Sequence, residues 1–332
     1  MSNILEPRLV FAPFEYPEAY DFWLSQQQAH WLHSEISMGR DIADWSSNMK
    51  PEEKHIVGNI LKSFTQAEIM VGDYWMNKVG KWFPKPEIAM MAACFASMES
   101  VHAKSYAYLN ESLGLEDYAA FLNEPTAMAK LDNLIIPDSD SIENIARSIA
   151  VFSGFTEGVQ LFSSFAILMS FSTRNLLKGV GEVISFSVRD ESLHSKAGCW
   201  LFRKLIDEHP HLWTTELKNS ILDAARTAVK LEDDFIDRAF EFSETLDIYH
   251  NNEKIRINAS DIKQYIRFRA NTKLGDLGLG KNWKKLDEDS LKRMSWFDAL
   301  TSGTEFQDFF AGRVSSYSKG VSAQWDDIFE EA

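Results

Sequence analysis

Cysteine, glycine and proline are all scarce in this chain of 332 residues. Its two cysteines, Cys94 and Cys199, are too few for the disulfide framework of a small secreted domain, so we expect a reducing, cytoplasmic location. There are 16 glycines and 9 prolines, although tight turns depend on these residues. The composition therefore disfavours β-sandwiches and β-barrels, which are rich in tight turns.

Positive charge is also in short supply, and the longest apolar stretch is interrupted by an acid. The 34 lysines and arginines are outnumbered by 49 acidic residues, giving a net charge of −15, so we expect no nucleic-acid partner. The opening residues, MSNILEPRLV, lack the apolar stretch of a signal peptide. The weakly charged stretch 148–173 is long enough to span a membrane, but Glu157 lies near its middle. We interpret it as a buried helix and expect no membrane partner.

Most of the chain has the apolar periodicity of α-helices. Apolar residues make up 45% of the sequence and recur at helical spacing, whereas period-two alternation is rare. The predicted helices span roughly 17–36, 51–78, 86–113, 117–134, 141–172, 177–207, 214–244 and 260–274. The sequence becomes polar after Gly278, and its last stretch has no amphipathic period. We predict one all-α domain over residues 1–295 and a partly or wholly mobile tail over residues 296–332.

Four glutamates lie in otherwise apolar helical surroundings. Glu68, Glu99 and Glu157 are each the only charged residue within a stretch of at least ten, and Glu191 closely follows an uncharged run. Burying an unpaired carboxylate is costly, so something cationic is expected beside them. Two of the four are followed by a histidine three residues later, in the pairs Glu99–His102 and Glu191–His194. Residues three apart share a helix face, so each pair can reach one metal ion.

Two other Glu-x-x-His pairs are interpreted as ordinary surface. Glu52 and His55 lie in a charged first helical turn, where acidic residues favour the start of a helix. Glu208 and His211 flank Pro210, which breaks the helix that they would need to share. Their spacing alone is therefore weak support for a metal site.

The order of the first four glutamates is more informative than either pair alone. A lone buried glutamate precedes each pair, Glu68 by 31 residues and Glu157 by 34. Two such helix pairs facing each other supply four carboxylates and two imidazoles, the arrangement of di-iron and di-manganese four-helix bundles. Carboxylate and imidazole ligands suit iron or manganese. The alternative is a metal-free bundle in which glutamate pairs directly with histidine or arginine.

With these residues, the chain resembles the small, radical-generating subunit of class I ribonucleotide reductase over most of its length. The family's ligand order falls on six residues: Glu68, Glu99, His102, Glu157, Glu191 and His194. The strings SMESVHAKSYAYL and VRDESLH are similar to family segments that carry ligands. The resemblance implies a ferritin-like four-helix bundle with additional helices, two metal ions per chain, a homodimer, and a large catalytic subunit as partner.

The resemblance also implies that the chain stores and transfers an oxidising equivalent. A dimetal site would hold the oxidant, which would start the reduction of ribonucleotides to deoxyribonucleotides in the large subunit. The implied route leaves the site at His102 and continues through three residues: Asp190, Trp31 and Tyr317. Tyr106 matches the family tyrosine that lies four residues after the first histidine. The last residues, 325–332, combine two aromatics with four acids, and we expect them to dock on the large subunit.

One ligand departs from the commonest pattern of the family. The first ligand is commonly aspartate in di-iron members, whereas here it is Glu68, as in subgroups that use manganese. The Mn/Fe subgroup usually replaces the tyrosine by phenylalanine, but this chain keeps Tyr106. The combination resembles the dimanganese subgroup. We therefore expect two manganese ions, with Mn/Fe or di-iron as alternatives, and an oxidant that is held on the metals.

Three other functions fit parts of the pattern. A stand-alone ferritin-like dimetal oxidase acting on a small apolar substrate needs the same six ligands, but no radical route and no docking tail. Metal storage is a second alternative, although storage proteins are usually much shorter chains. A metal-free helical scaffold is the third, and two bound metal ions per chain would exclude it.

Overall fold

The computed structural model describes residues 3–115, 123, 125–133, 140–251 and 253–297. The α-helices in these ranges are α1 (Pro17–Gln28), α2 (Gly39–Ala43), α3 (Pro51–Tyr74), α4 (Gly80–Trp82), α5 (Pro86–Leu113), α6 (Pro125–Asn133), α7 (Ile142–Val151), α8 (Phe162–Thr173), α9 (Lys178–Glu208), α10 (Thr215–Ala239), α11 (Ala259–Asp276) and α12 (Glu288–Arg293). One antiparallel hairpin joins β1 (Leu246–His250) to β2 (Glu253–Ile257). No helix in the described ranges is both long enough and apolar enough to cross a membrane.

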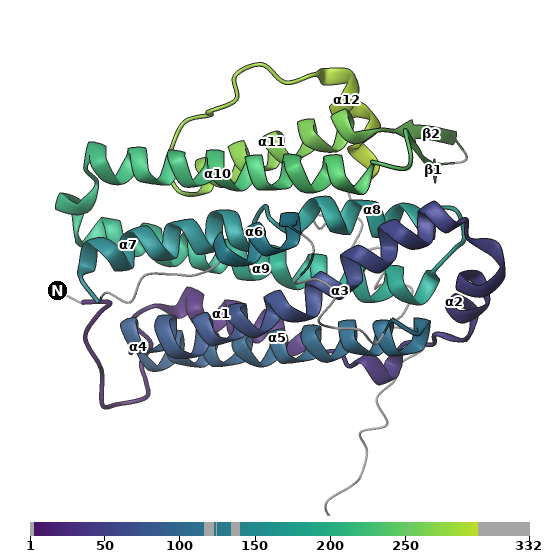
Figure 1. Cartoon of the computed structure of the whole chain (residues 1–332). Helices are drawn as coiled ribbons and strands as arrows, with labels where there is room; N and C mark the ends of the chain where they lie inside the picture. Colours follow the sequence, from purple (N-terminus) through teal and green to yellow (C-terminus); the bar gives the residue numbers. More distant parts are fainter. Residues whose placement is uncertain (1–2, 116–122, 124, 134–139, 252, 298–332) are drawn as a thin grey trace, which may run out of the picture.

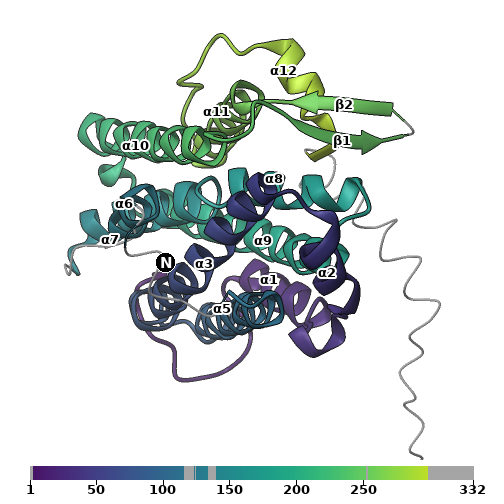
Figure 2. The same ribbon diagram turned by 45° about the vertical axis from the view of Figure 1, so that its right-hand side comes forward.

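The long helices are arranged in layers (Figure 1, Figure 2). Helices α1, α3 and α5 lie on one side, α7, α8 and α9 lie in the middle, and α10 and α11 cover them on the other side. Helix α3 packs along α5, and α8 packs along α9. This arrangement places α3, α5, α9 and the α7–α8 segment around one interior, and these four elements carry the predicted metal ligands.

Local sequence explains where α5 begins and ends. Pro86 occupies the first helical position, where its missing N–H group costs nothing. Gly114, directly after the last residue of the helix, adopts the left-handed conformation with φ of 71°, which terminates helices at little steric cost. The predicted bounds 86–113 are therefore confirmed, and Glu99 and His102 lie one turn apart on this helix.

The helix predicted over 141–172 is wrong in its middle. Helix α7 ends at Val151, residues 152–156 form a π-helical turn, and residues 157–161 form a non-helical turn before α8. Gly158 suits this turn because a β-carbon there would lie only 2.3 Å from the carbonyl oxygen of Gly154. Glu157 consequently lies in an interruption between two helices rather than within one.

The helical domain extends two residues beyond the predicted boundary at 295. Trp296 and Phe297 are 1% and 0% exposed. The Phe297 ring lies 5.4 Å from the ring of Tyr265 on α11 and 6.5 Å from that of Phe162 on α8. Their aromatic packing makes these two residues part of the core. The rest of the predicted tail, 298–332, lies outside the described residues, and so does Tyr317.

A buried carboxylate anchors the N-terminal segment to the domain. Glu87, at the start of α5, is 0% exposed. It accepts hydrogen bonds from Arg8 at 2.7 Å and from the backbone N–H groups of Glu15 and Tyr16 at 2.8 and 3.0 Å. Because removing one partner of a buried ion pair leaves the other charge uncompensated, Glu87→Ala should lower the free energy of unfolding by about 3 kcal/mol. Chemical denaturation of the metal-free protein measures this change.

The matched control is Glu18→Ala on α1. Glu18 pairs with Lys204, but both side chains are exposed, so its loss should cost less than about 1 kcal/mol. Equal effects of the two substitutions would show that Glu87 does not anchor the N-terminal segment.

Candidate metal centre

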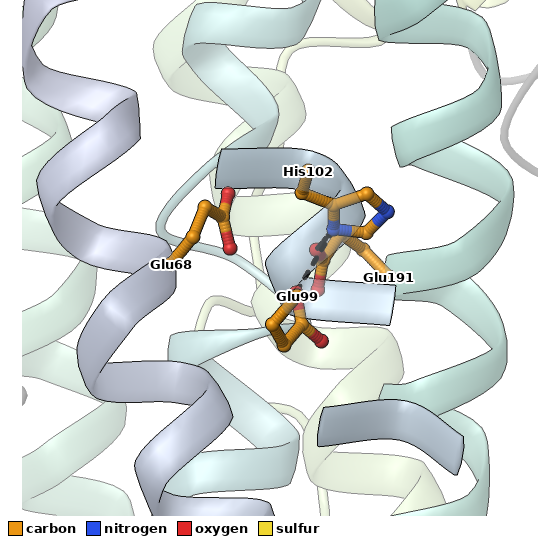
Figure 3. A group of neighbouring side chains, drawn as sticks. All are labelled: Glu68, Glu99, His102 and Glu191. Atoms are coloured by element: carbon orange, nitrogen blue, oxygen red, sulfur yellow. Dashed lines mark hydrogen bonds and ion pairs between the residues drawn. The ribbon is translucent and has the colours of Figure 1, made fainter. Parts of the chain in front are cut away.

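The six residues predicted as metal ligands lie together inside the domain. Their positions are Glu68 on α3, Glu99 and His102 on α5, Glu191 and His194 on α9, and Glu157 in the turn after the π-helical residues. Each is at most 1% exposed. Figure 3 shows the side chains of four of them converging between the helices: Glu68, Glu99, His102 and Glu191.

The six side chains form two overlapping groups of potential ligands. In each group, the potential ligand atoms lie within 4.8 Å of one another. The first group consists of Glu68, Glu99, His102 and Glu191, and the second of Glu99, Glu157, Glu191 and His194. Glu99 and Glu191 belong to both groups. Because a carboxylate has two oxygens, each of these residues can offer one oxygen to each of two neighbouring cations. The two overlapping groups are therefore compatible with a dimetal site in which Glu99 and Glu191 would serve both positions.

Each histidine presents Nδ1 to the carboxylates and Nε2 to an outer partner. The Nδ1 atoms of His102 and His194 lie 2.9 and 2.7 Å from Glu99 oxygens. On the outer side, His102 Nε2 lies 3.2 Å from Asp190 Oδ2. His194 Nε2 lies 3.1 Å from Gln26 Oε1. If a metal ion displaced the Nδ1 proton, the acceptor beside Nε2 would keep the remaining proton there and leave the Nδ1 lone pair facing the metal.

Burial makes the charged cluster unfavourable without a cation. Burial and the neighbouring carboxylates of Glu99 and Glu191 raise the pKa of Glu68 well above its ordinary value. Burial would also raise the pKa of Glu99, but the charges of His194 and His102 outweigh it and lower this pKa to about 2. For all four carboxylates to stay ionised, the cluster needs positive charge beyond what the two histidines supply.

The donor set fits two divalent metal ions. Both side-chain oxygens of Glu68 and Oε2 of Glu157 are buried and have no hydrogen-bond partner in the described structure. Buried acceptors of this kind are costly unless something binds them. Two divalent cations would balance the four carboxylate charges and supply the missing partners. The ligands combine oxygen and imidazole nitrogen, as iron and manganese sites do.

The sequence as a whole matches one protein family. A family model described as "Ribonucleotide reductase, small chain" matches residues 8–289. The chain belongs to this family. It is 32% identical to a probable ribonucleoside-diphosphate reductase small subunit of Invertebrate iridescent virus 3, over 97% of this chain and 88% of the relative. It is 25% identical to the ribonucleoside-diphosphate reductase subunit beta of Chlamydia pneumoniae, over 94% of this chain and 91% of the relative.

Solved structures share the fold. A putative class I ribonucleotide reductase from Bacillus halodurans has a TM-score of 0.75 and 22% identity, covering 86% of this chain and 99% of that one. The dimanganese(II) NrdF of Streptococcus sanguinis has a TM-score of 0.73 and 20% identity, covering 87% and 99%. The predicted ferritin-like all-α fold is confirmed, with the hairpin as an addition. The predicted function, the small subunit of a ribonucleoside-diphosphate reductase, is also confirmed, and the buried cluster is compatible with the dimetal-carboxylate site of the family.

Three residues of the predicted radical-transfer route form a hydrogen-bonded row. Trp31 Nε1 donates to Asp190 Oδ2 at 2.8 Å, and the same oxygen lies 3.2 Å from His102 Nε2. Arg189 donates to the other oxygen, Oδ1, at 2.8 Å. Burial would raise the pKa of Asp190, but the charge of Arg189 and the hydrogen bond to His102 outweigh it and lower the pKa. Asp190 is therefore an ionised acceptor between the indole and the imidazole.

Tyr106 lies in the same interior, one helical turn after His102. Its side chain is 0% exposed, and its ring lies 4.9 Å from that of Phe64 and 6.3 Å from that of His102. Burial and the neighbouring charge of Glu68 raise the pKa of Tyr106 well above its ordinary value, so the phenol is neutral. The structure thus brings Tyr106 close to the first group of ligands.

Two residues beside the predicted ligands were not predicted from the sequence. Trp75 Nε1 donates to Glu157 Oε1 at 2.5 Å. Trp75 follows Glu68 by seven residues, about two helical turns, so its place on the ligand-bearing face could have indicated this contact. Gln26, the partner of His194, is one of three consecutive glutamines on α1, and nothing in the sequence distinguishes it from the other two.

A cavity reaches the cluster from the side of Glu157. It lies between α3, α6, α10 and the turn, and its lining includes Ala67, Lys130, Gln160, Phe235 and Glu157 itself. Gln160 is 2% exposed, and neither polar atom of its side chain has a hydrogen-bond partner in the described structure. Of the six predicted ligands, Glu157 alone is among the residues that line this cavity.

Proposed function

We propose that the small chain holds two metal ions through the six predicted ligands and passes an oxidising equivalent to a large subunit. The observation that carries this proposal is that Glu99 and Glu191 belong to both ligand groups, since shared carboxylates hold two metal ions side by side. Glu68 and His102 would complete one position, and Glu157 and His194 the other. When bound, the metal ions would supply the oxidising power, which side chains of this kind do not provide alone.

Metal analysis and a coupled assay test the proposal together. The metal-free chain is loaded with Mn(II) or Fe(II) separately, because iron binds such ligands more tightly and would mask manganese. We expect two metal ions per chain, and ribonucleotide reduction when the large subunit is added. Fewer than two bound ions with either metal would contradict the ligand assignment. Full metal loading without ribonucleotide reduction would favour a dimetal oxidase that acts alone.

We propose the row of Trp31, Asp190 and His102 as the first part of the route to the large subunit. Trp31 would give up an electron toward the cluster, and Asp190 Oδ2, 2.8 Å from the indole nitrogen, is placed to take its proton. Arg189 holds the other oxygen of Asp190, so that Oδ2 keeps facing the indole. Tyr317, outside the described residues, is proposed as the next carrier, as the family resemblance implies.

We propose manganese in both positions, with Mn/Fe as the second choice. The proposal rests on the combination of Glu68 with Tyr106, which resembles the dimanganese subgroup. Both oxygens of Glu68 lack a hydrogen-bond partner in the described structure, so this longer ligand is available to bind through one oxygen or two. The oxidant would then be held on the metals, and Tyr106 would carry no radical.

If the oxidant is held on the metals, Tyr106→Phe should retain most of the ribonucleotide reductase activity. The substitution removes a single oxygen atom from a buried ring, so the packing against Phe64 is preserved. Activity with the large subunit and electron paramagnetic resonance after activation are the two measurements. Tyr108→Phe on the same helix is the matched control, since its hydroxyl donates to the Ile36 carbonyl away from the cluster. Loss of both activity and a tyrosyl radical signal in Tyr106→Phe would contradict the manganese assignment.

We propose that the protein is a homodimer, as the family resemblance implies.

We propose that residues 298–332, which follow the two core residues Trp296 and Phe297, are the docking tail for the large subunit. Deleting the residues after Gln324 removes Trp325 and Phe329 together with the four terminal acids. Buried aromatic anchors are each worth about 2 kcal/mol or more, so affinity for the large subunit should fall at least roughly 100-fold. Titration calorimetry measures this fall. Metal loading and thermal stability should not change, and an unchanged affinity would contradict the docking role.

A further inference from the structure

Glu157 is positioned by a turn, whereas the other five predicted ligands lie on α3, α5 and α9. The backbone hydrogen bonds here are irregular: the N–H of Glu157 donates to Phe152, five residues back, and that of Phe162 donates to Val159, three residues back. A regular helix would fix the direction of the side chain through its own hydrogen bonds. In this turn, the position of the carboxylate depends on contacts with neighbouring elements.

Arg269 of α11 makes such a contact directly beside Glu157. Its Nε atom donates to the carbonyl oxygen of Gly158 at 2.8 Å. Its guanidinium carbon lies 3.2 Å from the centre of the Phe162 ring. Gly158 follows the ligand, and Phe162 is the first residue of α8, so Arg269 contacts the turn at both of its ends. The arginine is 8% exposed, and water therefore competes little for these contacts.

At Gly158 the turn is also closely packed between α9 and α11. A β-carbon at Gly158 would lie 2.8 Å from Ser195 Oγ of α9 and 2.9 Å from Lys273 Cδ of α11. Ser195 directly follows the predicted ligand His194. The turn therefore lies against both α11 and the helix that carries His194, so a movement of the turn between them changes the position of Glu157 relative to His194.

We propose that Arg269 is a positioning residue for the metal position formed by Glu157 and His194. The inference rests on the proposed two-metal function. Arginine suits the role because Nε donates along the side chain while the flat guanidinium covers the aromatic ring. Lysine has a charge of the same sign but neither the Nε donor nor the flat face. Loss of these contacts weakens this metal position selectively, because the ligands of the other position all lie on helices.

Titration of the metal-free protein with Mn(II) tests the inference in Arg269→Lys and Arg269→Gln. Outer residues that orient metal ligands typically contribute 10- to 100-fold to metal affinity, so one of the two binding constants should fall by about that factor while the other is retained. Electron paramagnetic resonance should show an isolated Mn(II) signal at metal concentrations that give a coupled pair in the wild type. Arg267→Lys is the matched control, because Arg267 lies on the same helix but pairs with Asp233 of α10.

The selectivity of the loss separates positioning from general stability. The inference would be overturned if both binding constants of the Arg269 variants fell equally, in proportion to the fall in Tm of the metal-free protein. It would also be overturned if neither constant changed. Phe162→Leu keeps the hydrogen bond and removes the ring, so a smaller loss at the same position is expected. It provides the test if the Arg269 variants do not fold. Wild-type protein that binds fewer than two ions would instead contradict the proposed function itself.

Discussion

His102→Ala should leave the small chain unable to hold two metal ions. His102 is the single imidazole in the first ligand group, and alanine would leave three carboxylates there with no neutral donor. The substitution also removes the link between the cluster and Asp190. We expect at most one tightly bound metal ion per chain after loading with Mn(II), and no ribonucleotide reduction with the large subunit. Elemental analysis after removal of free metal measures the stoichiometry.

His55→Ala is the matched control for this substitution. Glu52 and His55 have the same Glu-x-x-His spacing as the ligand pairs. His55 is exposed, its Nε2 lies 3.0 Å from the Asn59 side chain, and its ring packs on Phe242. Its loss should change neither the metal content nor the activity. Two ions per chain in His102→Ala would remove His102 from the ligand set.

That most of the predicted ligands lie close together could be predicted because a helix determines which side chains share a face. Glu99 and His102 need only one turn of α5 to point the same way, and Pro86 and Gly114 mark the ends of that helix in the sequence. The repeat of a lone glutamate before each Glu-x-x-His pair indicated that two helix pairs face each other. Distances between the helices could not be predicted, because they depend on packing between distant segments.

The interruption at Glu157 could not be predicted, because its causes are contacts between elements far apart in the sequence. Gly154 and Gly158 in an apolar run are compatible with a closely packed helix and with a turn. The turn is selected by Ser195 and Lys273, which leave no room for a β-carbon, and by the hydrogen bond from Arg269. None of these partners lies within 35 residues of Gly158 in the sequence.

The hairpin was missed for a different reason, the shortness of its pattern. Leu246 and Ile248 are buried and alternate with more exposed residues over a strand of only five residues. Ile257, which is also buried, lies opposite Leu246 in the register. Five residues give too little alternation to stand out from a chain in which helical periodicity dominates.

Trp31→Phe should stop ribonucleotide reduction while leaving the metal site intact. Phenylalanine keeps an aromatic ring in the buried space beside Phe186, so the fold should tolerate the change. It has no N–H group to donate to Asp190, and a benzene ring is far harder to oxidise than an indole. Trp31 supplies no ligand atom, so two metal ions per chain and the affinity for the large subunit should be retained. Turnover with the large subunit should fall to the level of the metal-free protein.

The comparison with Trp23→Phe shows whether turnover requires a tryptophan at position 31 in particular or is sensitive to the loss of any tryptophan. Trp23 lies on α1, is partly buried, and stacks on Tyr20 at a ring distance of 5.4 Å. The chemical change is the same, but Trp23 lies outside the row that ends at His102, so normal turnover is expected. Loss of metal in Trp31→Phe would mean that Trp31 supports metal binding and that the loss of turnover follows from an incomplete metal site. Metal retained with turnover lost in Trp31→Phe, together with normal turnover in Trp23→Phe, would separate electron transfer from metal binding.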